Sequence, residues 1–207
     1  MSKLFLASSF ANVIDLFSEF VGELNGKKVV FIPTASKVEE VTFYVDDAKN
    51  ALSNKGVDIK ELDLTTATFS EIAEQLEHCD FIYISGGNTF FLLEQLKRTG
   101  ADKLIIQQVN AGKLYVGESA GAMIASPNIH YVQLMDSVES APHLVEYDAL
   151  KLVDFYPVPH YTNFPFVEAA QNMIDTYSTT LHLIPITNEQ AIIVDAELVA
   201  IKTKIQG

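Results

Sequence analysis

The chain has 207 residues, of which 48% are hydrophobic, and a formal net charge of −13. This length and composition suit one domain with a substantial core, and no Pro-, Gly- or Ser-rich linker divides the sequence, so we predict a single domain over residues 1–207. Arg98 is the only arginine. An acidic chain with one arginine lacks the basic footprint of nucleic-acid-binding proteins, and we expect no nucleic-acid partner.

The sequence also argues against a membrane or secreted location. No run approaches the roughly 18 apolar residues of a membrane span. Ser8, Ser9, Asn12 and Asp15 interrupt the apolar start before the core of a signal peptide could form. Cys79 is the only cysteine, so no internal disulfide or zinc cluster is expected. We therefore expect a soluble cytoplasmic protein without a membrane partner.

Short apolar runs rich in β-branched residues predict strands along the whole chain. The early runs are nearly uniformly apolar, which is typical of strands buried on both faces of a parallel sheet. The last three are closely spaced and predict antiparallel pairing. The predicted strands are Lys3–Ala7, Lys28–Pro33, Asp58–Leu62, Asp80–Ser85, Leu114–Gly117, Leu152–Pro157, Leu181–Pro185, Gln190–Val194 and Val199–Lys202.

Stretches with helical periodicity alternate with the early strands. This alternation predicts an α/β fold: a three-layer, doubly wound, mostly parallel sheet with helices on both faces. In such a sheet, functional groups gather in the loops beyond the carboxyl ends of the strands. The predicted helices are Ala11–Leu24, Val41–Asn54, Ser70–Glu77, Thr89–Arg98 and Asp102–Asn110.

The most informative of these loops is Gly117-Glu118-Ser119-Ala120-Gly121, which directly follows the apolar run Leu114–Val116. A serine on a sharp turn between a strand and a helix has its hydroxyl exposed, as a nucleophile requires. Glycines two residues before and after the serine allow close approach of neighbouring backbone. Ala120 begins a run of small residues that reads as a helix start, and its backbone N–H points where an oxyanion would form.

A second loop, Ser85-Gly86-Gly87-Asn88-Thr89, leaves the predicted strand Asp80–Ser85 and opens a helix. Bare glycine N–H groups at a helix N-terminus suit an oxyanion or a substrate carboxylate. A tight turn with Asn88 or Thr89 as the helix N-cap explains the same residues equally well.

His160 follows the predicted strand Leu152–Pro157 and is the best candidate for a general base that accepts the Ser119 proton. His130, close to the predicted elbow helix, is its nearest rival. The remaining histidines lie at a helix end, in a polar loop and in a late strand, and compete poorly; these are His78, His143 and His182.

Three ordered motifs together carry a family resemblance. They are Gly86-Gly87-Asn88-Thr89-Phe90, Gly117-x-Ser119-Ala120-Gly121-Ala122 and Pro159-His160-Tyr161-x-Asn163. With them the chain resembles the peptidase E and cyanophycinase family of serine peptidases, which have a class I glutamine amidotransferase-like fold. The resemblance implies Ser119 as nucleophile, His160 as base, backbone N–H groups of Gly87 and Ala120 as the oxyanion hole, and short peptides or isoaspartyl-like amides with an acidic first residue as substrates.

The third member of the catalytic triad is left open by the sequence. The family's triad acid lies in a turn before a late strand, and a gapless match places Asn188 there, with Glu189 one residue beyond. A one-residue slip would restore the carboxylate. Asp136 is a further candidate. If Asn188 holds the place, it can orient His160 but stabilises the imidazolium less than an anion would.

Substrate preference also departs from the family. An aspartyl dipeptidase is expected to bind the substrate carboxylate with an arginine downstream of the catalytic histidine, and no arginine follows His160. We expect Arg98 to act as a cation at a helix C-terminus. A neutral amide at the first residue, such as asparagine, then suits the pocket better than aspartate.

The sequence therefore predicts a metal-free, cofactor-free serine peptidase with a small peptide as its partner, either a monomer or a homodimer. One alternative is a weak or inactive family member that binds a small amino acid or peptide. A general esterase of the α/β-hydrolase fold is a weaker alternative, because the interval from Ser119 to His160 is short for that fold.

Overall fold

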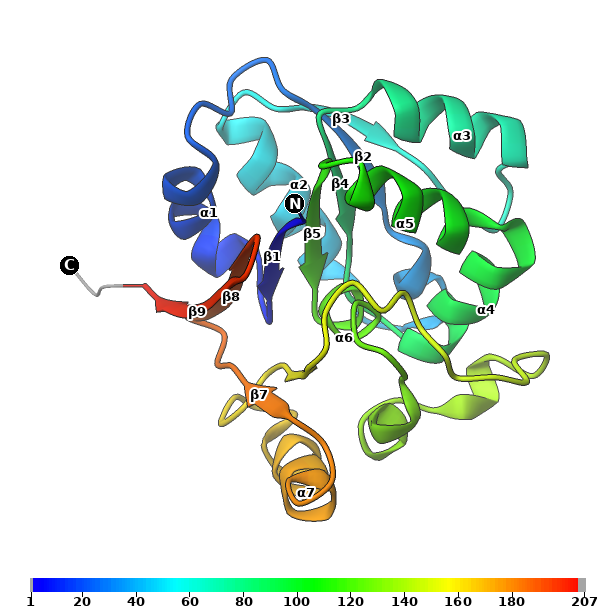
Figure 1. The fold of residues 1–207 in the computed structure, drawn as a ribbon, viewed down its shortest axis with the longest axis vertical. Coiled ribbons are helices and arrows are strands. Elements are labelled where there is room, and N and C mark those ends of the chain that lie inside the picture. The colour runs from blue at the N-terminus through cyan, green and yellow to red at the C-terminus, as the bar shows by residue number, and fades with distance from the viewer. Residues whose placement is uncertain (1, 205–207) are drawn as a thin grey trace.

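The computed structural model describes residues 2–204, and its largest element is a seven-stranded sheet of order β3-β2-β4-β5-β1-β8-β9 (Figure 1). Strands β1 to β5 run parallel, β8 pairs antiparallel with β1, and β9 pairs antiparallel with β8. The predicted mostly parallel α/β sheet is confirmed. Its strands are β1 (Lys3–Ala7), β2 (Lys28–Ile32), β3 (Asp58–Glu61), β4 (Phe81–Ile84), β5 (Leu114–Glu118), β8 (Gln190–Asp195) and β9 (Leu198–Thr203).

Helices cover both faces of this sheet, as the alternating sequence pattern predicts. Figure 1 shows α1 (Ile14–Val21) and α2 (Phe43–Asn54) on one face, and α3 (Phe69–His78), α4 (Thr89–Thr99) and α5 (Ala101–Asn110) on the other. The side chains of successive residues in a strand point to opposite faces of the sheet, so they pack into two separate cores. Along β1, for example, Phe5 packs into the α1–α2 core, whereas Leu4 and Leu6 pack into the core under α3 to α5.

Most predicted element boundaries agree with the structure to within a few residues, and local sequence explains where the helices begin and end. Thr68 and Glu71 form a reciprocal capping box at the start of α3. Gly100 ends α4 in the left-handed conformation. The predicted helix Ala11–Leu24 is too long, because a 3-10 turn occupies its first residues and α1 ends before Gly22.

The region between β5 and β8 differs most from the prediction. The expected strand Leu152–Pro157 is only β6 (Tyr156–Val158), because the backbone N–H groups of Leu152 and Val153 both donate to the carbonyl of Ala125 instead of to a neighbouring strand. β6 pairs in parallel with β7 (Leu183–Pro185) in a separate two-stranded sheet, so the antiparallel prediction for β7 is wrong.

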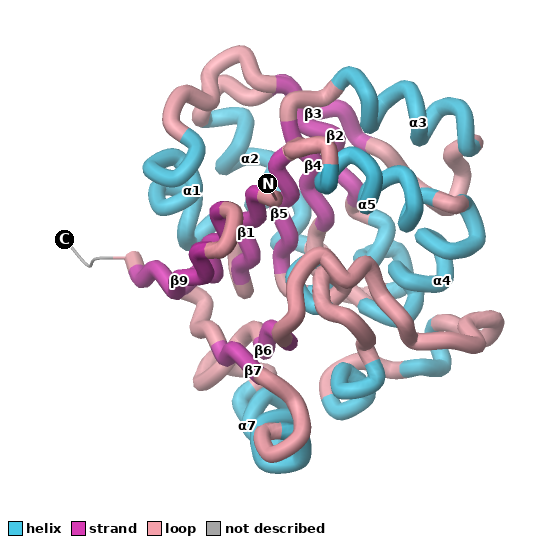
Figure 2. The backbone as a smooth tube through the Cα atoms, viewed as in Figure 1, coloured by secondary structure: helices cyan, strands magenta, loops and turns pink. Residues whose placement is uncertain are grey.

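A helix that was not predicted, α7 (Val167–Tyr177), lies in the connection between β6 and β7. Two parallel strands need a crossover between them, and a helix is the usual solution. Figure 2 shows this small β6–α7–β7 unit beyond the carboxyl ends of the central strands. The loops after β1, β2, β4 and β5 leave the sheet at this same edge, where the predicted functional residues lie. None of the helices in residues 2–204 has the length and apolar character needed to cross a bilayer.

Candidate active site

Ser119 occupies a sharp turn between β5 and α6 (Ala120–Met123), as the sequence predicts. Its φ of 49° and ψ of −106° are strained for a residue with a side chain. The turn leaves no room beside it, because a Cβ on Gly117 would lie 2.2 Å from the carbonyl oxygen of Gly121, and one on Gly121 would lie 2.1 Å from that of Ile84. Both glycines are therefore needed for the elbow to form.

A chain of hydrogen bonds runs from the serine through the predicted histidine. His160 Nε2 lies 3.0 Å from Ser119 Oγ, and His160 Nδ1 lies 2.8 Å from Asn188 Oδ1. An amide oxygen only accepts hydrogen bonds, so this arrangement assigns the proton to Nδ1 and leaves Nε2 free to accept the serine proton. Burial lowers the pKa of His160 from its usual value, which favours the neutral ring that a general base requires.

His160 is held in place by groups at the ends of β1 and β7. Its φ is +60°, an uncommon conformation for a non-glycine residue. The backbone N–H donates to Ser8 Oγ at 3.0 Å, and the Ser8 hydroxyl donates to the carbonyl of Ile186 at 2.9 Å. The imidazole stacks on Phe166 with ring centroids 4.8 Å apart. The sequence analysis gave Ser8 no role in the site, although Ser8 directly follows a predicted strand.

Of the three candidates for the orienting residue, the structure brings Asn188 to His160. Its backbone N–H donates to Asn163 Oδ1 at 2.9 Å, which fixes the loop before β8. Glu189 instead accepts a hydrogen bond from Asn12 Nδ2 at 3.1 Å. The one-residue slip that would place a carboxylate beside the imidazole is therefore absent from this structure.

Asp136, the other predicted carboxylate, caps α4. Its Oδ2 accepts from both the backbone N–H and the hydroxyl of Thr89, at 2.8 and 2.6 Å. A carboxylate at this position interacts favourably with the positive end of the helix, while burial raises the pKa of Asp136 to about 6. Asp136 thus bonds to the loop after β4 and not to His160.

Asn88 and Thr89 were predicted to bind substrate, but their side chains form hydrogen bonds with other residues of the chain. Asn88 is the N-cap of α4: its Oδ1 accepts from the N–H of Phe91, and its Nδ2 donates to the carbonyl of Ser137. Both side chains are buried. The turn-and-cap alternative is therefore correct for the Asn88 side chain, and it leaves open the role of the glycine N–H groups in the same loop.

Gly86 and Gly87 lie against the elbow. Gly87 has a φ of +128°, and a Cβ there would lie 2.2 Å from the backbone of Ala35, so only glycine fits. A Cβ on Gly86 would lie 3.3 Å from that of Ser119. Within the part of the chain that the structure describes, the backbone N–H groups of Gly87 and Ala120 donate to no other backbone group. They are free to receive an oxyanion.

Glu118, inside the elbow itself, is a buried carboxyl group that sequence reasoning gave no role. Oε1 accepts from the N–H of Phe10 at 2.8 Å, and Oε2 accepts from the Tyr83 hydroxyl at 2.7 Å. Burial raises the pKa of Glu118 to about 7. This side chain joins the loop after β1 and strand β4 to the turn that carries Ser119. A lone charge in an otherwise apolar strand was the available sequence clue.

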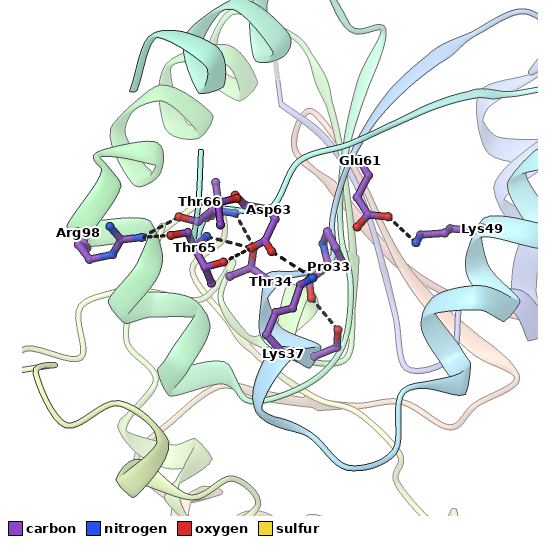
Figure 3. A network of polar contacts seen from close by, with 11 residues as sticks. Pro33, Thr34, Lys37, Lys49, Glu61, Asp63, Thr65, Thr66 and Arg98 are labelled. Carbon is purple, nitrogen blue, oxygen red and sulfur yellow. Dashed lines mark hydrogen bonds and ion pairs between the residues drawn. The ribbon is translucent and has the colours of Figure 1, made fainter. Parts of the chain in front are cut away.

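Arg98 takes no part in this site. It lies in the last turn of α4, as predicted, and Nη2 donates to the carbonyls of Leu64 and Thr65 at 2.8 and 3.3 Å (Figure 3). The guanidinium therefore holds the loop after β3. His130, the rival base, is exposed, and its Nδ1 lies 3.4 Å from Gln133 Nε2.

Comparisons with known proteins show which family this chain resembles. The sequence profile of peptidase family S51 matches residues 2–202. An uncharacterized peptidase of Pasteurella multocida is 62% identical over the full length of both chains. A peptidase E of Salmonella arizonae is 33% identical over 68% of this chain and 58% of its own length.

Two solved structures of peptidases are also similar to this chain. A crystal structure from Listeria monocytogenes, described as a proposed peptidase E, is 54% identical and covers 98% of each chain with a TM-score of 0.95. The crystal structure of a peptidase from an acI-B1 Actinobacterium covers 99% of this chain and 88% of its own with a TM-score of 0.75, at 21% identity. This second likeness is one of fold.

Proposed function

Because the chain belongs to peptidase family S51 and is thus a peptidase, we propose that it is a serine peptidase that hydrolyses short peptides, with Ser119 as its nucleophile. The observation that carries the proposal is the continuous line of hydrogen bonds from Ser119 Oγ through His160 to Asn188. A nucleophile bonded to a base, itself oriented by a third group, is the arrangement that activates a serine hydroxyl.

In the acylation step, Ser119 Oγ attacks the scissile carbonyl carbon while its proton passes to His160 Nε2. The resulting oxyanion accepts hydrogen bonds from the backbone N–H groups of Gly87 and Ala120. The tetrahedral intermediate then collapses: the C–N bond breaks, and His160 Nε2 returns its proton to the leaving amine. Deacylation repeats the sequence with water, whose proton passes to His160 and then to Ser119, and releases the first residue as a carboxylic acid.

Asn188 gives the site a neutral orienting group. It fixes the tautomer and direction of the imidazole but supplies no negative charge to stabilise the imidazolium that forms in each step. We therefore expect a slow peptidase. The same observation favours the second candidate function, a family member that binds a small amino acid or peptide and turns it over weakly.

We further propose that the first residue of the substrate is uncharged. Bidentate recognition of a carboxylate favours a guanidinium, and Arg98 donates to the loop after β3 instead. Asparagine in first position presents an amide that needs no cation.

A panel of dipeptides that differ only in the first residue tests the proposal. We expect Asn-Leu to be hydrolysed faster than Asp-Leu, and Ser119→Ala to hydrolyse neither. Efficient hydrolysis of Asp-Leu without a gain for Asn-Leu would contradict the specificity while leaving the Ser119 chemistry intact. Unchanged hydrolysis by Ser119→Ala would contradict the mechanism. Saturable binding without hydrolysis would favour the second candidate.

A further inference from the structure

The strand order places different groups on the two sides of Ser119. His160 is held by Ser8, after β1, and by Asn188, before β8. Gly86 follows β4, on the other side of β5. Given the proposed function, on which this inference rests, the leaving amine must lie beside His160 to receive its proton. The first residue of the substrate must then extend to the opposite side, toward Gly86.

Tyr44, in the first turn of α2, forms part of the surface on that side. Its ring edge lies 3.4 Å from the point that a Cβ of Gly86 would occupy, and Ser119 Cβ lies 3.3 Å from the same point. The tyrosine and the nucleophile therefore contact the same face of one glycine. This is the position that a side chain must have to contact the residue whose carbonyl Ser119 attacks.

The hydroxyl of Tyr44 is a buried polar group without a partner among the described residues. Buried hydroxyls in folded proteins nearly always have a hydrogen-bond partner, since leaving one unpaired is unfavourable. The buried hydroxyl of Tyr83, by contrast, donates to Glu118 Oε2. The unpaired Tyr44 oxygen marks a place where a bound ligand supplies the missing partner.

The charges around this hydroxyl indicate which kind of partner fits. Burial, followed by the negative charges of Glu39, Glu118 and Asp136, raises the pKa of Tyr44, which keeps the phenol neutral. Lys37, in the segment between β2 and α2, is paired with Asp63 at 3.1 Å. A neutral phenol oxygen surrounded by carboxyl groups accepts a hydrogen bond from a cation better than it donates one to an anion.

We propose that the Tyr44 hydroxyl accepts a hydrogen bond from the protonated amino group of the first substrate residue, with the Glu39 carboxylate as the opposing charge. Substrates of this site then carry a free amino terminus. The same carboxyl groups repel an acidic side chain on the first substrate residue. This repulsion adds to the effect of Arg98 being placed elsewhere, and both favour an uncharged first residue.

Binding measured by calorimetry in the Ser119→Ala protein separates this inference from catalysis. We expect Asn-Leu to bind at least about tenfold more tightly than N-acetyl-Asn-Leu, which keeps the side chain but lacks the cation. Adding Tyr44→Phe should remove most of that preference, and Glu39→Gln should reduce it. Tyr177→Phe, which deletes a hydroxyl at the end of α7, is the matched control and should leave the preference unchanged.

Equal binding of the two peptides, no binding of either, or a preference that survives Tyr44→Phe would each overturn the inference. Hydrolysis by the protein with Ser119 intact reports separately on the proposed function. There, Tyr44→Phe should raise KM for Asn-Leu about tenfold and change kcat little, since the contact is made in the ground state and the transition state alike. A fall in kcat alone would mean that Tyr44 acts on the chemistry and does not bind the amino group.

Discussion

The two sides of Ser119 differ in how completely their polar groups are satisfied. On the side of β1 and β8, His160 has partners for both ring nitrogens and for its backbone N–H, and its ring stacks on Phe166. On the side of β4 and β2, the Tyr44 hydroxyl and the N–H of Gly87 have no such partners among the described residues. In the proposed function, one side is complete before substrate binds, and the other is completed by the substrate.

This difference matches what each side must do. A general base needs one fixed orientation at all times, so its hydrogen bonds are made within the fold. Groups that bind substrate or stabilise an oxyanion need free hydrogen-bonding capacity. Changes on the histidine side should therefore affect the chemical step, whereas on the glycine side changes at Tyr44 should affect substrate binding and changes at Glu118 should affect stability.

The largest effect is expected at Ser119, where the two sides meet. Ser119→Ala should lower kcat by on the order of 10⁴-fold or more, because no other group can form the acyl intermediate. The fold should persist, since alanine removes only the hydroxyl; thermal unfolding checks this. Ser70→Ala, at an exposed position of α3, is the control and should be as active as the parent. If Ser119→Ala keeps most of its activity, a serine nucleophile is excluded.

His160→Ala should lower kcat nearly as much as Ser119→Ala does. The Ser119→Ala/His160→Ala double variant should be little less active than either single variant, because the effects of residues that act as one unit are not additive. His130→Ala serves as the comparison, since that ring is exposed and lies outside the hydrogen-bond chain. A damaging His130→Ala together with a harmless His160→Ala would reverse the assignment of the base.

A smaller effect, of opposite sign, is expected from Asn188→Asp. The change keeps the shape of the side chain and places a negative charge at His160 Nδ1, so kcat should rise by roughly tenfold or more. The pKa of His160 should also rise, because a carboxylate favours the imidazolium. The acid limb of the kcat/KM profile, where activity is lost as the base becomes protonated, should then move to higher pH.

Glu189→Gln is the control for that experiment, because Glu189 bonds to Asn12 and not to His160. It should leave both kcat and the pH profile unchanged. A loss of activity in Glu189→Gln, with no gain in Asn188→Asp, would show that the loop before β8 shifts in solution to bring the carboxylate to the histidine.

The smallest effect concerns stability on the glycine side. The pKa of Glu118, raised by burial to about 7, lies above its ordinary value of 4.5. Between these values the folded chain holds a proton that the unfolded chain has released, so the free energy of unfolding should fall as pH rises through this range. Glu118→Gln does not titrate, and its unfolding should depend less on pH over the same range. Denaturation by urea at pH 5 and pH 7 gives the change in the free energy of unfolding between the two pH values. An identical change in the parent and Glu118→Gln proteins would contradict the raised pKa of the buried Glu118.

Much of the fold follows from the sequence because its signals are local. Apolar strands alternating with amphipathic helices predicted the central sheet, and Gly117 and Gly121 around Ser119 predicted the elbow that the structure contains. The β6–α7–β7 unit was predicted poorly. Its two strands are only three residues each, and they pair with one another outside the main sheet.

The site was predictable to the extent that it lies on those local elements. Ser119 and His160 follow from strand ends and spacing, and their 3.0 Å contact agrees with that prediction. The choice between Asn188 and Glu189 depends on a one-residue difference in a loop, which no local pattern decides. Tyr44 and Glu118 were missed since their importance comes from burial and from the loops that meet around them.

Whether Ser119 is activated by His160 is tested most directly with a serine-reactive phosphonate. Intact-protein mass spectrometry should show one adduct on the unmodified chain, peptide mapping should place it on Ser119, and the rate of labelling should fall steeply in His160→Ala. The His130→Ala protein should label at the parent rate. Absence of an adduct on Ser119, or equal labelling of the parent and His160→Ala proteins, would contradict a serine activated by His160.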